Sequence, residues 1–360
     1  QRCLVAFFLE KYHFGTILAT HFFEKQKIIF FMKRLLFFSV LSALLFAACN
    51  DTNNGKNDTY LPPSVGPINS VAVVIDNDLW EGTIGDTIRR YFAAPVDGLP
   101  TEEPTFTLHQ IPPQVFEGNT RNSRNILIVQ RGDEKKAFVK ENLFAKPQVV
   151  CVVQGKQVRD IACKVEEYHK EFVNEFKNNE LIETRKRFDN SLSKDKQVEN
   201  TLGVKFTMPN VFNIQKYGNN FFWMERPIKG GKASIILYEM PLGSIPTDEE
   251  GRAKTIVKMR DSIGEKYIPG PEKGMYMVTE TYLAPSISEV MIKGHKAIES
   301  KGLWEVKGFA LGGPYINYII EDKAHNRLLV VEGFLYAPGV AKRDMLFELE
   351  AIVKSIEFTR

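Results

Sequence analysis

A short apolar run near the start of the chain constrains the fold first, because it decides how much of the 360-residue sequence folds as a domain. Residues 35–46 are almost entirely apolar and follow the positive charges of Lys33 and Arg34. A run of this length falls short of the roughly 20 apolar residues that span a bilayer, and it is typical of a secretory signal. We therefore predict a signal peptide at residues 32–48 and exclude it from the folded part.

The residues that end this run are Ala47, Ala48 and Cys49, and they resemble a bacterial lipobox. The resemblance implies cleavage before Cys49, a diacylglyceryl thioether on its sulfur and a fatty acid such as palmitate on the new amino terminus. Phe46 departs from the pattern, because Leu is commoner at that position. Each buried acyl methylene contributes about 0.8 kcal/mol, so Cys49 would anchor the protein to a membrane. The alternatives are an ordinary secretory peptide with a chance cysteine and an uncleaved transmembrane anchor.

The flanking segments carry no domain pattern. Residues 1–31 begin with Gln1, and we predict that they are translated upstream sequence. The competing interpretation is a tandem of apolar segments at residues 3–9 and 28–46. After the lipidated cysteine, residues 49–69 are rich in Asn, Asp, Gly and Pro and are predicted to form a disordered tether.

Charge and cysteine content exclude some classes of function. Residues 1–48 hold six basic and two acidic residues, so their removal lowers the net charge from +3 to −1. A nucleic-acid-binding role thereby loses its main support, and we expect no nucleic-acid partner. Besides Cys49, the remaining chain holds only Cys151 and Cys163, which could form a disulfide in an oxidising compartment or remain two unpaired thiols.

The first lobe is predicted over residues 70–190. Apolar and β-branched runs predict strands, and 3.6-residue periodicity predicts helices. The expected strands are 70–76, 105–111, 124–130 and 148–154, and the expected helices are a first helix opening at Thr83, a short one near 136–144 and a long one at about 157–187. This order, βαββαβα, predicts a ferredoxin-like split-βαβ lobe with a long extra helix.

The second lobe is predicted over residues 199–360 as antiparallel sheet with helices, which gives the whole chain a mixed α/β, α+β class. The expected strands are 211–217, 221–226, 232–239, 275–282, 286–298, 302–306, 315–321 and 327–335, and the expected helices are 247–266 and 339–356.

Three stretches carry a family resemblance: SVAVVIDNDLWEG, VKFTMPNVFNI and FLYAPGVAKRDMLFELEAIVKSIEF. Together with the lipobox, they resemble a lipoprotein family of Bacteroidetes known as domain-of-unknown-function family 4837, over most of residues 32–360. The resemblance implies an envelope location and no assigned activity. The second lobe alone also resembles the PsbP-like α/β/α sandwich, which mostly serves as a non-catalytic binding module.

Two clusters are candidate ligand or partner surfaces. The first cluster is Asp76, Asp78 and Trp80, which follow a buried strand and precede a helix. In α/β units, ligands often bind at this position. This cluster lacks the EF-hand pattern, and the alternative is a strand-to-helix turn with Trp80 packed as an anchor. Trp223 and Arg226 lie on an aromatic hairpin arm that could bind sugar, peptide or protein, or could simply fill the core.

Other motifs indicate turns and solvated side chains. The stretches 229–232 and 312–314 are predicted to be turns. No histidine pair has metal-ligand spacing and there is no GxSxG elbow, so we predict no metal, no cofactor and no catalytic residue.

These patterns predict a lipid-anchored protein of the Gram-negative cell envelope, placed at the outer membrane and acting as a non-catalytic binding module for an envelope protein or polymer. The alternatives are a small-ligand receptor that uses a cleft between the lobes and a hydrolase of envelope polymers that uses Asp76 and Asp78.

Overall fold

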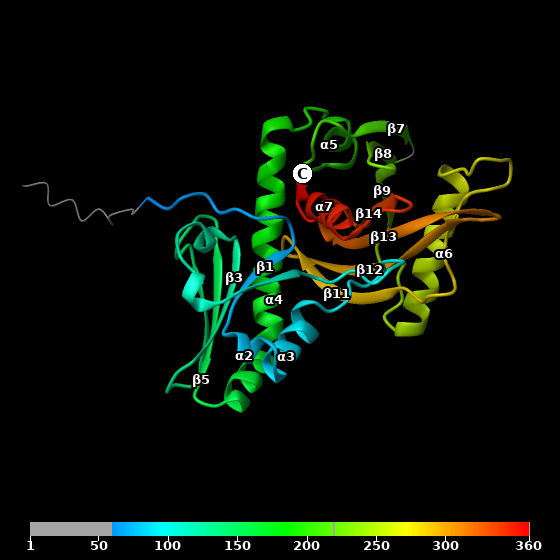
Figure 1. Cartoon of the computed structure of the whole chain (residues 1–360). Coiled ribbons are helices and arrows are strands. Elements are labelled where there is room, and N and C mark those ends of the chain that lie inside the picture. The colour runs from blue at the N-terminus through cyan, green and yellow to red at the C-terminus, as the bar shows by residue number, and fades with distance from the viewer. Residues whose placement is uncertain (1–59, 219, 360) are drawn as a thin grey trace, which may run out of the picture. The chain divides into compact units, whose positions relative to one another are not determined.

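A five-stranded sheet with its helices forms the first lobe in the computed structural model, which describes residues 60–218 and 220–359 (Figure 1). Its elements are β1 (Ser70–Val74), α2 (Asn77–Trp80), α3 (Thr83–Phe92), β2 (Thr107–Ile111), β3 (Asn125–Arg131), β4 (Lys136–Glu141), β5 (Val149–Gly155) and α4 (Val158–Phe188). The strand order is β2-β1-β3-β5-β4, in which only β4 is antiparallel to its neighbour.

The connectivity of this lobe differs from the expected ferredoxin-like order. The segment 136–144, expected as a helix, is instead strand β4, which pairs along its whole length with β5. Alternate residues Ala137 and Val139 pack on the helix-side core, a period of two that suits a strand. The three parallel pairings β2–β1, β1–β3 and β3–β5 were not expected either.

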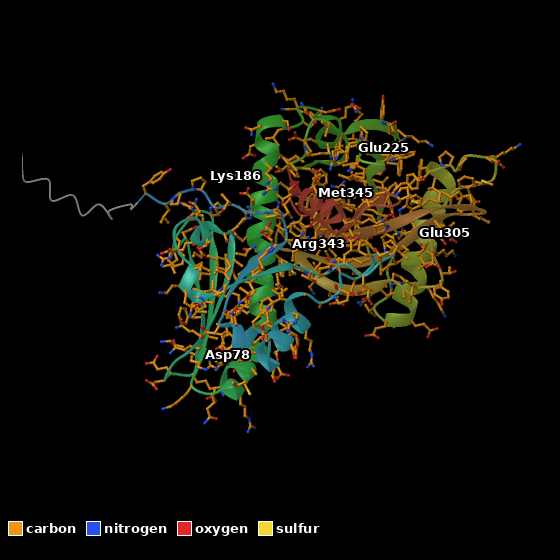
Figure 2. All side chains as sticks on the ribbon, viewed as in Figure 1. Asp78, Lys186, Glu225, Glu305, Arg343 and Met345 are labelled. Carbon is orange, nitrogen blue, oxygen red and sulfur yellow. The ribbon has the colours of Figure 1, made fainter. Side chains whose placement is uncertain are left out.

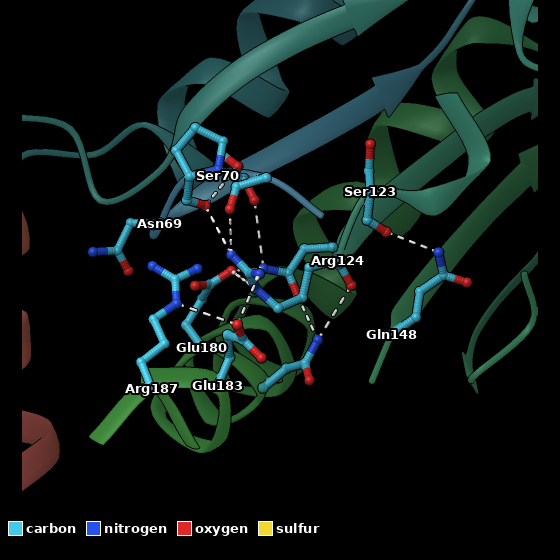
Figure 3. Close-up of polar contacts among 12 residues, drawn as sticks. Asn69, Ser70, Ser123, Arg124, Gln148, Glu180, Glu183 and Arg187 are labelled. Atoms are coloured by element: carbon cyan, nitrogen blue, oxygen red, sulfur yellow. Dashed lines mark hydrogen bonds and ion pairs between the residues drawn. The ribbon is translucent and has the colours of Figure 1, made fainter. Parts of the chain in front are cut away.

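A buried ion pair fastens α4 to β3 (Figure 3). Arg124 Nε donates to Glu180 Oε1 at 3.0 Å, and both side chains are at most 2% exposed. Asn125 donates to the same oxygen at 2.7 Å. Arg124 also donates to the carbonyls of Gly66 and Pro67. Part of the segment expected as a disordered tether is therefore packed on the first lobe.

An eight-stranded antiparallel sheet forms the second lobe, with the order β10-β12-β13-β14-β9-β8-β7 and β11 also paired with β12. Its elements are α5 (Gln197–Leu202), β6 (Val204–Lys205), β7 (Asn213–Gly218), β8 (Phe221–Ile228), β9 (Gly231–Pro241), α6 (Glu249–Tyr267), β10 (Met277–Thr279), β11 (Ser286–Ile292), β12 (His295–Val306), β13 (Phe309–Asp322), β14 (Arg327–Tyr336), α7 (Arg343–Val353) and β15 (Glu357–Phe358). The mixed α+β class in two lobes is thus confirmed.

Helices cover both faces of the second sheet. Alternate strand residues point to opposite faces of the sheet, so each face carries its own core. Residues of α6 pack into the core on one face, and residues of α5 and α7 pack into the core on the other (Figure 1). The stretch 312–314, expected as a turn, lies inside β13. A Cβ on Gly313 would meet the Leu335 carbonyl oxygen at 1.9 Å, so this glycine serves close strand packing rather than a turn.

Candidate binding site

A cavity of about 540 Å³ lies between the second sheet and the amino-terminal part of α6. We call it the α6 cavity. Its lining comes from five separate elements and the loop before α6: Gly243, Ile245, Pro246, Thr247, Arg252, Glu289, Val290, Met291, Lys296, Ala297, Ile298, Ile319, Glu321 and Leu328. Its volume lies within the 300–1,000 Å³ typical of small-ligand sites.

Strand register builds the floor of the cavity. Ile298 on β12 lies opposite Ile319 on β13, and Glu321 on β13 lies opposite Leu328 on β14. Residues that face each other across neighbouring strands point to the same side, here the side covered by α6. The floor is therefore apolar, with Glu321 at its edge.

Charged side chains form one wall. Arg252 on α6 pairs with Glu289 on β11 at 3.0 Å. The same guanidinium donates to the carbonyls of Pro246 and Thr247, so it ties the loop to the helix. Lys296 completes a rim of both signs around the apolar floor. The arrangement suits a ligand with an apolar body and polar ends.

The carboxylates of the first candidate cluster are paired with an arginine. Arg131, at the end of β3, forms ion pairs with Asp78 and, at 3.8 Å, with Asp76. The hydrogen bond from Arg131 holds the pKa of Asp78 below its ordinary value. Asp78 lies at the lower end of the first lobe in Figure 2. Neither carboxylate lines the α6 cavity or the other cavities described below.

Trp80, the third member of this cluster, packs against the first-lobe core. The guanidinium carbon of Arg89 lies 4.7 Å from the Trp80 ring centre, and Arg89 also donates to the Trp80 carbonyl. These contacts fit a packed anchor residue.

Trp223 and Arg226 do not share a face. Trp223 packs on the side of the sheet covered by α6, whereas Arg226 pairs with Glu348 of α7 at 2.8 Å on the other side. The Arg226 guanidinium also lies 5.5 Å from the Phe212 ring centre. The aromatic–arginine surface expected from the hairpin is therefore not assembled by these two residues.

Several other predicted features lie elsewhere. Cys49 lies outside the described residues. Cys151 is buried and Cys163 exposed, and both are free thiols. A cavity of about 190 Å³ is lined by residues between Ser193 and Met224, and no residue of the first lobe lines it. Over residues 60–218 and 220–359, no group of His, Cys, Asp and Glu could hold a metal, and no helix is long and apolar enough to cross a bilayer.

Family models match each lobe separately. Residues 191–355 match the model "Domain of unknown function (DUF4837)", and residues 64–189 match "Domain of unknown function (DUF8532)". Each lobe is therefore similar to an uncharacterised family. The expected resemblance to family 4837 holds for the second lobe, whereas the first lobe matches a different model.

Other comparisons are weak. No curated protein matches the chain. A crystal structure from Bacteroides thetaiotaomicron VPI-5482 is similar at 14% identity over 44% of this chain and 46% of that chain, with a TM-score of 0.24. This chain thus covers less than half of that protein. The Ran-binding protein Mog1p of Saccharomyces cerevisiae is similar at 10% identity over 44% of this chain and 90% of its own, with a TM-score of 0.30. At these scores neither likeness carries an argument.

Proposed function

We propose that this chain is a lipid-anchored envelope protein, held at the outer membrane through Cys49, that acts as a non-catalytic binding module. The α6 cavity is the observation that supports a binding role best, because it combines a suitable volume with an apolar floor and a charged rim. Its ligand would be an amphiphile or a peptide segment that comes from another envelope component.

The chemistry of the lining supports binding rather than catalysis. Thr247 is the one hydroxyl among the residues that line the α6 cavity, and the lining holds neither His nor Cys. Of its two carboxylates, Glu289 is paired with Arg252 and Glu321 lies at the edge of the floor. Nucleophilic catalysis needs a nucleophile with a base within hydrogen-bond reach. The hydrolase alternative rested on Asp76 and Asp78, and it gains no support from their ion pairs with Arg131.

Filling the cavity tests the proposal. Ile298 is half-buried on the cavity floor, so Ile298→Trp should occupy the space that a ligand needs. The control is Tyr282→Trp, because Tyr282 is 91% exposed and lies outside the lining. A thermal-shift screen with fatty acids, phospholipids, short peptides and glycan fragments would compare the two variants with the unmodified chain.

A true ligand at 100 times its Kd stabilises the folded state by about 2.7 kcal/mol. We expect one chemical class to raise the Tm of the unmodified chain and of Tyr282→Trp but not of Ile298→Trp. A class that stabilises all three proteins equally binds elsewhere and would contradict the assignment to this cavity.

A further inference from the structure

All charged residues that line a second, smaller cavity are basic. It measures about 280 Å³ and is lined by Asn178, Leu181, Ile182, Arg185, Met291, Ile292, Lys293 and Lys354. These residues come from α4, from the end of β11 and the turn after it, and from the end of α7. We call it the basic cavity. Arg185, Lys293 and Lys354 are its charged residues, and no carboxylate lines it.

The carboxylates nearest to this cavity are already shared among several cations. Glu350 pairs with Lys354 at 2.6 Å, and Glu299 pairs with Lys301 at 2.9 Å. Lys354 also lies 3.9 Å from Glu299. The ammonium of Lys177 also interacts electrostatically with Glu350 and Glu299. The guanidinium of Arg185 interacts with Glu350. Lys354, Lys301, Lys177 and Arg185 are therefore four cations around two anions.

Other acidic residues do not remove this excess. Glu357, whose pKa the nearby Lys293 helps to lower, is paired with Lys205 at 2.9 Å. Asp97 raises the pKa of Lys301 by electrostatic attraction, but it does so less than Glu350 and Glu299 do. The region around the basic cavity therefore keeps unmatched positive charge.

Arg185 is held in place by a backbone carbonyl, and Glu350 acts on it only from a distance. Its Nε donates to the Ala351 carbonyl at 3.0 Å, and no carboxylate of the described residues forms an ion pair with it. Burial lowers the pKa of Arg185, and burial likewise lowers the pKa of Lys177. Both shifts mean that burial outweighs the attraction of Glu350 for these two cations, so their charges are only partly compensated.

We propose that the basic cavity binds a phosphate group. A guanidinium fork and two ammonium groups match phosphate oxygens, and a dianion offsets more of the excess charge than a carboxylate does. The exposed side chains of Ile182 and Met291 would contact the apolar part of a phosphate-bearing molecule. The phosphate would belong to a free phosphate ester or to a lipid headgroup. The basic cavity shares only Met291 with the α6 cavity, and the phosphate proposal does not depend on a ligand in the α6 cavity.

Calorimetric titration of the full chain with inorganic phosphate tests the proposal. Lys293→Gln removes an exposed charge at a turn and should leave the fold intact, whereas Arg185→Gln removes the guanidinium itself. A lost hydrogen bond to a charged group is worth roughly 1.5–3 kcal/mol, so either variant should weaken binding by about tenfold or more. Lys186→Gln is the matched control, because Lys186 is an exposed residue of the same helix outside the lining (Figure 2).

The outcomes separate clearly. Phosphate binding that survives Lys186→Gln and weakens in both other variants supports the proposal, with equal Tm values for Lys293→Gln and the unmodified chain as the folding check. No phosphate binding, or equal binding by all variants, overturns it. Acetate as a titrant should bind more weakly than phosphate, and equal binding would overturn the preference for a dianion.

Vesicles then distinguish the source of the phosphate. The chain with Cys49→Ala is used, so that no acyl chain inserts by itself. Retention on vesicles that contain phosphatidic acid, whose phosphomonoester can carry two charges, supports a lipid headgroup if it is lost with Lys293→Gln. Phosphate binding without retention on vesicles supports a free phosphate ester.

Discussion

Glu350 is a mostly buried carboxylate, 15% exposed, whose ionised form depends on its neighbours. Burial by itself would raise its pKa, but the ammonium groups of Lys354 and Lys301 outweigh burial and lower the pKa to about 2. Because the ordinary value is 4.5, the unfolded chain binds a proton at this group between pH 4.5 and 2 while the folded chain does not. The stabilisation is therefore complete above about pH 4.5 and is lost as the pH falls toward 2.

We expect this single group to contribute about 3 kcal/mol to the free energy of unfolding at neutral pH. Glu350→Gln should reduce the loss of stability between pH 4.5 and 2 by about this amount, as measured by denaturant unfolding at a series of pH values, whereas the other carboxylates with lowered pKa values, such as Asp322, keep their share of the loss. Glu250→Gln serves as the control, because Glu250 is exposed and pairs only with exposed Lys254. A Glu350→Gln curve parallel to that of the unmodified chain would show that the pKa is not lowered.

At the scale of elements, α6 packs so closely on β10 that one position admits no side chain. A Cβ on Gly264 would lie 1.9 Å from the Met277 carbonyl oxygen. In an exposed helix, replacing glycine by alanine stabilises by about 1 kcal/mol. Here we expect Gly264→Ala to destabilise by about 1–3 kcal/mol, because the helix must move away from the strand.

Urea unfolding of Gly264→Ala measures this effect. Glu265→Ala on the next, exposed residue is the control and should change stability by less than about 0.5 kcal/mol. A stabilised Gly264→Ala protein would mean that α6 and β10 are not in close contact.

The elements that could be predicted are those defined by local patterns. The long helix was expected at 157–187 and lies at Val158–Phe188, because its apolar stripe repeats at helical spacing. The prediction of a helix at strand β4 is wrong, because this segment is a strand through its pairing with β5, and a local pattern does not show that pairing. The parallel strand order also depends on contacts between distant segments, which no local pattern encodes.

The site was harder to predict for the same reason. The α6 cavity combines residues from 243 to 328, and each of them looks ordinary in its own strand or loop. The separation of Trp223 from Arg226, by contrast, could have been deduced, because residues three apart on a strand point to opposite faces.

At the scale of the whole molecule, membrane attachment at Cys49 remains a prediction. Cys49→Ala should move the protein from the membrane fraction to the soluble fraction, since two or three acyl chains on one cysteine would provide the stable attachment. Cell fractionation with immunoblotting measures this, and Cys163→Ala is the control because Cys163 is an exposed free thiol. A Cys49→Ala protein that stays with the membranes would refute lipidation as the anchor.

Helix α4 is a shared member of both lobes. It has 31 residues, or about 46 Å at 1.5 Å per residue. Ile161 and Phe172 pack in the first-lobe core, whereas Leu181 packs with Phe347 and Ala351 of α7. The family-model matches meet at residue 190, just beyond this helix. Local opening of either lobe therefore exposes apolar surface of the other, so the two should behave as one cooperative folding unit although they match as separate modules.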